Sequence, residues 1–233
     1  MQTHSSAELG ARSKYQWTVT TKPIKLDLEI MNAFETLTPQ NRKELNDLTE
    51  ILIKKFSSEI PMFEKSITEF SLEDPIDEHS YHFINVPLLL RLALLDLCIL
   101  FKHYSNTTSE TEQNLFARLI CGQLYEFTED VPKLFGKKYR KSLSDLPEAD
   151  KFTSELNLVI KIFIERSNKY KDTLKTIRHN ISHHRDIDGV LQVKLIEQLD
   201  FKFVTDAYID LTQWFTIYFA KHENELFKMA SKT

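Results

Sequence analysis

Residues 83–101 read FINVPLLLRLALLDLCILF and form the most hydrophobic stretch of the chain. Asn85, Pro87, Arg91 and Asp96 interrupt it. A helix that spans a lipid bilayer rarely carries two charges near its middle. The stretch therefore predicts a buried core helix in a protein that has no membrane partner.

The composition around this stretch indicates which fold surrounds the core helix. The chain has 233 residues, of which 42% are hydrophobic, and this is enough to bury a substantial core. Only four glycines occur, whereas the turns of an all-β fold need residues that tolerate positive φ. We therefore expect an all-α fold, an up-and-down helical bundle with a poorly regular N-terminal arm.

Helical spacing of apolar residues and capping signals place the other elements. Thr38 and Pro39 are suited to begin a helix, and Ser109 with Glu112 forms a capping-box pattern. Gly136 and Gly189 mark breaks, and Pro61 predicts a bend before a short helix. The short helix after the bend is expected to end near Phe70. Four further helices are expected over about residues 86–104, 109–131, 147 to the 180s, and 190–227.

The chain is expected to divide into two parts. Residues 1–80 form an N-terminal arm with accessory helices, and residues 81–233 form the main bundle. The first 36 residues show little helical periodicity. Residues 71–80 and 136–150 are expected to be a loop and a basic connector.

Charge is unevenly distributed. The net charge is -4, yet residues 133–185 contain 13 Lys and Arg against 6 Asp and Glu. Such a positive region attracts phosphates, although a solvated lysine-rich helix face gives the same pattern. Cys98 and Cys121 lie in apolar runs and are expected to be buried free thiols. Residues 1–17 contain no apolar run of the kind found in a secretory signal. These features predict a cytoplasmic protein.

The chain lacks a glycine-rich phosphate loop, a nucleophile elbow, paired CxxC motifs and the HExxH motif. No cofactor is therefore expected. The strongest chemical signal is TIRHNISHHRD, residues 176–186, where three histidines and two arginines occur within eight positions. Arg178 can hold a phosphate, and His183 can transfer a proton near neutral pH. Five residues correspond to about 140° around an α-helix, so the pair meets only if the helix distorts or a symmetry mate contributes.

A metal site is a second interpretation of the same residues. His179 and His183 share a helix face, and Asp186 falls near it, with His184 and Asp188 close by. Two imidazoles and a carboxylate can bind zinc or a redox metal. The neighbouring guanidinium groups of Arg178 and Arg185 disfavour a divalent cation, and a solvated helix end is a third interpretation.

The string RHNISH resembles the signature of the HEPN superfamily, in which an Arg is followed by four to six residues and a His. Arg178 matches the arginine, His179 its polar neighbour and His183 the histidine, while His184 fits an alternative spacing. The segment ARLICGQLYEF, residues 117–127, is similar to a helix of that family that bears an Arg and a Tyr-Glu pair. The resemblance covers about residues 88–227.

This resemblance implies a homodimer with two motifs facing a shared cleft, acting as a metal-independent endoribonuclease of the toxin or defence type. Arg178 would stabilise the scissile phosphate, His183 would act as acid or base, and His179 or Asn180 would orient the pair. RNA and a protein antitoxin or regulator are the implied partners. Some members of the family are noncatalytic modules that bind RNA, nucleotides or a partner protein, and this alternative stays open.

Charged residues elsewhere have simpler expected roles. Arg91 and Asp96 should be paired if they are buried, as should Arg118 and Glu126. They could support the motif, but ion pairs within the bundle are the simpler interpretation. His222 is expected on the surface.

Overall fold

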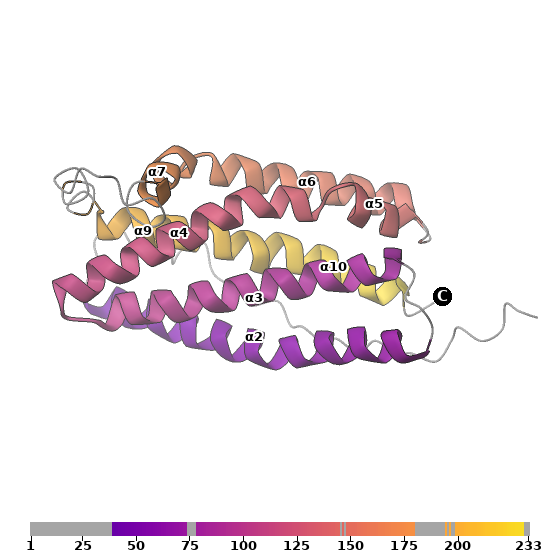
Figure 1. Cartoon of the computed structure of the whole chain (residues 1–233), viewed down its shortest axis with the longest axis horizontal. Coiled ribbons are helices and arrows are strands. Elements are labelled where there is room, and N and C mark those ends of the chain that lie inside the picture. The colour runs from indigo at the N-terminus through magenta and orange to yellow at the C-terminus, as the bar shows by residue number, and fades with distance from the viewer. Residues whose placement is uncertain are drawn as a thin grey trace, which may run out of the picture.

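The computed structural model describes residues 39–73, 78–144, 146, 148–179, 194, 196 and 199–230. Within these ranges the chain is helical and contains no strand. Figure 1 shows long helices lying side by side: α2 (Pro39–Glu73), α3 (Glu78–Asn106), α4 (Glu110–Leu134) and α6 (Ala149–Ser167). The C-terminal part consists of α9 (Phe201–Gln213), a π-helical segment (Trp214–Phe219) and α10 (Ala220–Ala230). The predicted all-α helical bundle is confirmed.

Several helix boundaries differ from the prediction. Pro61 lies inside α2 and does not separate two helices. Buried Phe56 and Phe63 flank it and hold both halves of the helix against the core. The first residue of α3 is Glu78, so this helix begins earlier than residue 86. The arm, Thr38 and Gly189 lie outside the described residues.

Two further differences concern connecting segments. The expected basic connector contains the helix α5 (Lys137–Ser144), because Tyr139 and Leu143 share a face that is buried in the core. The expected helix over 190–227 is interrupted, since Leu199 and Asp200 are not helical. Asp200 caps α9 by accepting a hydrogen bond from the backbone N–H of Lys202 at 3.1 Å.

One face of the predicted core stretch is buried in the bundle, whereas Leu89, Leu92 and Ile99 of the same stretch are 39–41% exposed. Leu94, Leu97, Cys98 and Phe101 of α3 are fully buried. They belong to one hydrophobic core to which α2, α4, α5, α6, α7, α9 and the π-helical segment also contribute. The rings of Phe101 and Tyr208 stack with centroids 3.9 Å apart, which joins α3 to α9.

Arg91 is the most deeply buried charge of α3. Its guanidinium donates to Glu59 of α2 at 2.7 Å and to both carboxylate oxygens of Glu223 of α10 at 2.8 and 2.6 Å. The Phe63 ring lies 4.3 Å from the guanidinium carbon. Burial alone would lower the pKa of Arg91, but the two carboxylates outweigh it and raise the pKa. The expectation of paired buried charge holds for Arg91, whereas Asp96 is exposed.

By length and composition alone, residues 81–106 of α3 could cross a membrane. In the bundle, α3 instead packs against α2, α4 and α5. The charge of Arg91 is satisfied by carboxylates from two other helices.

The expectation that His222 lies on the surface is wrong. The residue is only 4% exposed, and its ring packs edge-on against Phe152 with centroids 6.2 Å apart. Burial lowers the pKa of His222, while the Glu155 carboxylate, 3.7 Å from Nδ1, opposes this shift. Neither ring nitrogen has a hydrogen-bond partner among the described residues.

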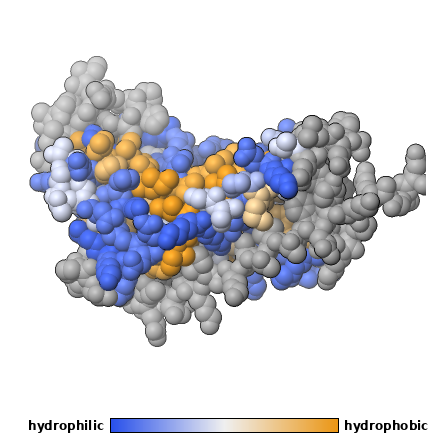
Figure 2. All heavy atoms as spheres, turned by 90° about the horizontal axis from the view of Figure 1, so that it is seen from below, coloured by the Kyte–Doolittle hydropathy of each residue, from blue (hydrophilic) through white to orange (hydrophobic). Residues whose placement is uncertain are grey.

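Apolar side chains also reach the surface. Figure 2 shows a band of hydrophobic residues bordered by hydrophilic ones on the face seen from below Figure 1. Large apolar residues at least 37% exposed occur on α2, α3, α4 and α6: Ile51, Met62, Tyr81, Leu89, Leu92, Ile99, Leu115, Leu119, Leu158 and Ile164.

Candidate functional site: the end of α7 on α4

The first residues of the predicted motif lie at the end of α7 (Lys171–Ile177). Leu174 and Ile177 are buried and attach this short helix to the bundle, where it packs against α4. At Arg178 and His179 the chain widens into a π-helical turn. Such turns are uncommon and are frequent at functional sites.

The remaining predicted residues of the motif lie outside the described part of the chain: Asn180, His183, His184, Arg185, Asp186 and Asp188. The arrangement of Arg178 and His179 is therefore the part of the motif whose contacts are known. The open choice between His183 and His184 stays a prediction.

Arg178 is bound to α4. Its Nε and Nη2 atoms both contact Oε1 of Glu126, and its guanidinium carbon lies 5.5 Å from the centre of the Tyr125 ring. The Arg178 side chain is 19% exposed and that of Glu126 is 39% exposed, so the pair lies at the edge of the solvent. His179 is exposed and approaches the same tyrosine edge-on, with centroids 6.0 Å apart.

A second ion pair joins α7 to α4 one turn further along. Lys171 Nζ lies 2.7 Å from the Glu129 carboxylate. The hydrogen bond from Lys171 lowers the pKa of Glu129, and the charges of Lys133 and Lys175 add to the effect. Acidic groups of α4 thus face basic groups of α7 along their contact.

Glu126 and Arg118 were both expected in ion pairs. Glu126 is paired, but its partner is the motif arginine. Arg118 instead donates from Nε to the backbone carbonyl of Asn114 at 3.2 Å, and no carboxylate pairs with it in the described part of the chain.

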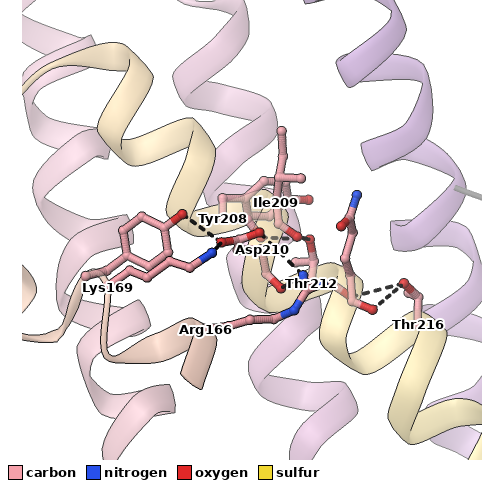
Figure 3. A network of polar contacts seen from close by, with 9 residues as sticks. Arg166, Lys169, Tyr208, Ile209, Asp210, Thr212 and Thr216 are labelled. Atoms are coloured by element: carbon pink, nitrogen blue, oxygen red, sulfur yellow. Dashed lines mark hydrogen bonds and ion pairs between the residues drawn. The ribbon is translucent and has the colours of Figure 1, made fainter. Parts of the chain in front are cut away.

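The start of α7 is fixed by a buried carboxylate that the sequence analysis missed. Asp210 of α9 is only 8% exposed in its side chain, and Figure 3 shows Arg166 and Lys169 directed toward it. Oδ2 accepts hydrogen bonds from Tyr170 at 2.8 Å and Lys169 at 3.2 Å, and Oδ1 from Arg166 at 3.4 Å. Burial raises the pKa of Tyr170, and Asp210 raises it further. The sequence feature that could have revealed this buried carboxylate is the position of Asp210 within the aromatic stretch 208–219.

A groove of about 350 Å³ lies between α3 and α4. Leu89 and Ala93 line one side, and Gln123, Glu126 and Asp130 line the other. Because Glu126 also binds Arg178, the groove adjoins the end of α7.

Other reactive side chains do not form a site in the described ranges. Cys98 and Cys121 are buried free thiols, as expected, and burial raises the pKa of each to about 12. No group of three His, Cys, Asp or Glu that could hold a metal occurs among the described residues. The metal interpretation involves His183 and Asp186, which lie outside them.

Comparisons with protein-family models, curated proteins and solved structures find no match for this chain. Function is therefore inferred from the residues and their geometry.

Proposed function

We propose that the chain is a HEPN-like endoribonuclease that cleaves RNA without a metal ion, using Arg178 and His183. One observation carries the proposal: the motif arginine at the end of α7 is bound by Glu126 and Tyr125. These residues belong to the α4 segment that resembles the same family. The proposal places the protein in the cytoplasm, with RNA as substrate and a protein antitoxin or regulator as a partner.

The contacts of Arg178 leave it able to bind a phosphate. Glu126 accepts from Nε and Nη2 through a single oxygen, so one edge of the guanidinium is occupied. Nη1 has no hydrogen-bond partner among the residues that the structure describes. Arginine has five N–H donors in a fixed planar fork, and its free edge matches two phosphate oxygens. Glu126 thereby orients the cation without exhausting its donors.

The helix geometry also bears on the spacing of the motif. Residues five apart point in different directions in an α-helix, but a π turn bonds residue i to residue i+5. The chain adopts π geometry at Arg178 and His179. His183 lies outside the described residues, and the proposal requires that the turn after His179 brings its imidazole near Arg178.

The reaction proposed for this pair is transfer of the phosphodiester to the neighbouring 2′-hydroxyl. The bond from O2′ to phosphorus forms while the bond from phosphorus to O5′ breaks, which leaves a 2′,3′-cyclic phosphate and a 5′-hydroxyl. His183 takes the proton from O2′ or gives one to O5′, and the matching group of a second copy does the other. Arg178 stabilises the negative charge on the phosphate oxygens. His179 or Asn180 orients the pair.

The homodimer is proposed to form on the outer face of α3 and α4. Leu89, Leu92, Leu115 and Leu119 are 39–44% exposed there. Leu119 and Glu126 are seven residues apart on α4 and share one face, about 10 Å apart along the axis. A second copy seated on these leucines would bring its own α7 close to Arg178.

The test of cleavage uses single-stranded RNA in excess EDTA. Wild type is expected to cut, and Arg178→Ala and His183→Ala are each expected to abolish cutting while the dimer persists. Arg140→Ala is the control, because this arginine of α5 binds Asn157 of α6 and the backbone carbonyl of Phe135, which follows α4. Wild-type cleavage in both motif variants would refute the site. RNA binding without turnover would support the noncatalytic alternative, and cleavage that EDTA stops would support the metal alternative.

The dimer is tested separately by sedimentation velocity. Leu119→Glu is expected to yield monomers. Leu158→Glu, which alters an apolar residue 59% exposed on α6, should leave the dimer intact. A monomeric wild type would refute the dimer.

A further inference from the structure

The segment from the end of α6 through α7 is strongly basic. Residues 166–178 contain five basic residues and one acidic residue, Asp172. The basic residues are Arg166, Lys169, Lys171, Lys175 and Arg178.

Four of these cations have carboxylate partners. Arg178 is bound to Glu126 and Lys171 to Glu129, and Arg166 and Lys169 share Asp210. Lys175 differs from them, because its side chain is exposed and no carboxylate lies within ion-pair distance among the described residues. Its charge acts on Glu129 only at longer range.

Lys175 stands next to the candidate site. It precedes Arg178 by three residues and His179 by four, so it lies about one helical turn from each of them. This end of α7 borders α4 where Tyr125 contacts both Arg178 and His179. Lys169 precedes the first residue of α7 and is bound to Asp210 of α9 (Figure 3).

We propose that Lys175 binds the RNA phosphate next to the one held by Arg178, so that a single strand runs along α7. This inference rests on the proposed function and assigns a substrate-binding residue to the same site. One turn of helix is about 5.4 Å, comparable to the separation of successive phosphates along an extended strand. The exposed ring of His179 offers a surface on which an unpaired base can stack, which favours single-stranded RNA.

The experiment measures binding of a labelled single-stranded oligoribonucleotide by fluorescence anisotropy over a range of salt concentrations. Lys175→Ala is expected to raise Kd by about threefold to tenfold and to reduce the slope of log K against log salt by about 0.7, the value for one phosphate contact on a single strand. Lys175→Glu should weaken binding further.

Lys169→Ala is the matched control, since it removes the same charge from the same segment. It should change Kd less than twofold, because the Lys169 side chain is bound to Asp210 of α9 and lies away from Arg178. Both lysines are exposed, so unchanged circular dichroism and melting are expected and establish that the variants are folded.

The outcomes separate this inference from the proposed function. If wild type binds and cuts RNA but Lys175→Ala keeps the wild-type Kd and salt slope, the assignment of Lys175 is overturned and the nuclease proposal stands. Equal losses in Lys169→Ala and Lys175→Ala would indicate general attraction and would also overturn the assignment. If wild type binds no RNA at all, the proposed function fails as well.

Discussion

Replacing Arg91 with methionine should strongly destabilise the bundle. Methionine keeps an unbranched side chain of similar length but removes the charge that joins Glu59 of α2 to Glu223 of α10. Both carboxylates are buried, with side chains 8% and 2% exposed, so the substitution leaves them without their main partner. Lys55 stays near Glu59 at 3.9 Å but does not reach Glu223 within ion-pair distance in the described part of the chain.

The size of the effect follows from this burial. Removing one partner of a buried ion pair costs about 3–5 kcal/mol. For a chain of this length each kcal/mol corresponds to about 2–4 °C, so the melting temperature should fall by about 6–20 °C. The loss of stability relative to wild type should become smaller as the pH falls from 7. A buried carboxylate without a partner has a raised pKa, so the folded variant takes up protons that the unfolded chain does not, and this stabilises the folded state.

Thermal melts and urea titrations of Arg91→Met at pH 7 and pH 5 measure both effects. A triple variant that also carries Glu59→Gln and Glu223→Gln should recover part of the loss, since it removes the orphaned charges. A melting temperature within 2 °C of wild type, or a triple variant less stable than Arg91→Met, would refute the reasoning.

Three further predictions concern other carboxylates and a histidine. Because burial lowers the pKa of His222, stability should fall as pH drops below about 6.5, and His222→Phe should remove this part of the pH dependence in urea titrations at pH 5.5 and 7.5. Glu126→Gln should slow RNA cleavage by about tenfold to a hundredfold, since Arg178 loses the anion that orients it; unchanged single-turnover rates would make the pair purely structural. Asp210→Asn should lower the free energy of unfolding by about 1.5–3 kcal/mol, and an unshifted urea midpoint would contradict the role of this carboxylate.

The elements that local chemistry determines could be predicted from the sequence. Ser109 caps α4 as expected, accepting from the Glu112 backbone N–H at 3.4 Å. The reciprocal half of the predicted capping box does not form, because the Glu112 carboxylate accepts from Thr107 at 2.6 Å instead. Helix type and position thus follow from local spacing, whereas the choice among nearby polar partners does not.

Contacts between residues far apart in the chain could not be predicted from the sequence. Pro61 is a sound local signal for a bend, but burial of Phe56 and Phe63 on both sides keeps α2 continuous. His222 lies among charged neighbours in KHENELF, and only the packing of α10 onto α6 reveals its burial. The partner of Arg178 is 52 residues away, so its identity depends on how α7 sits on α4.

Two carboxylates from different helices fix α7 at its ends. Asp210 of α9 binds Tyr170, the residue before the helix, and Glu126 of α4 binds Arg178, the residue after it. A helix of seven residues has little intrinsic stability, so its position must come from such contacts and from buried Leu174. Loosening either end should therefore displace the motif arginine. Under the proposed function, Asp210→Asn, which loosens the start of α7, should slow RNA cleavage as Glu126→Gln does.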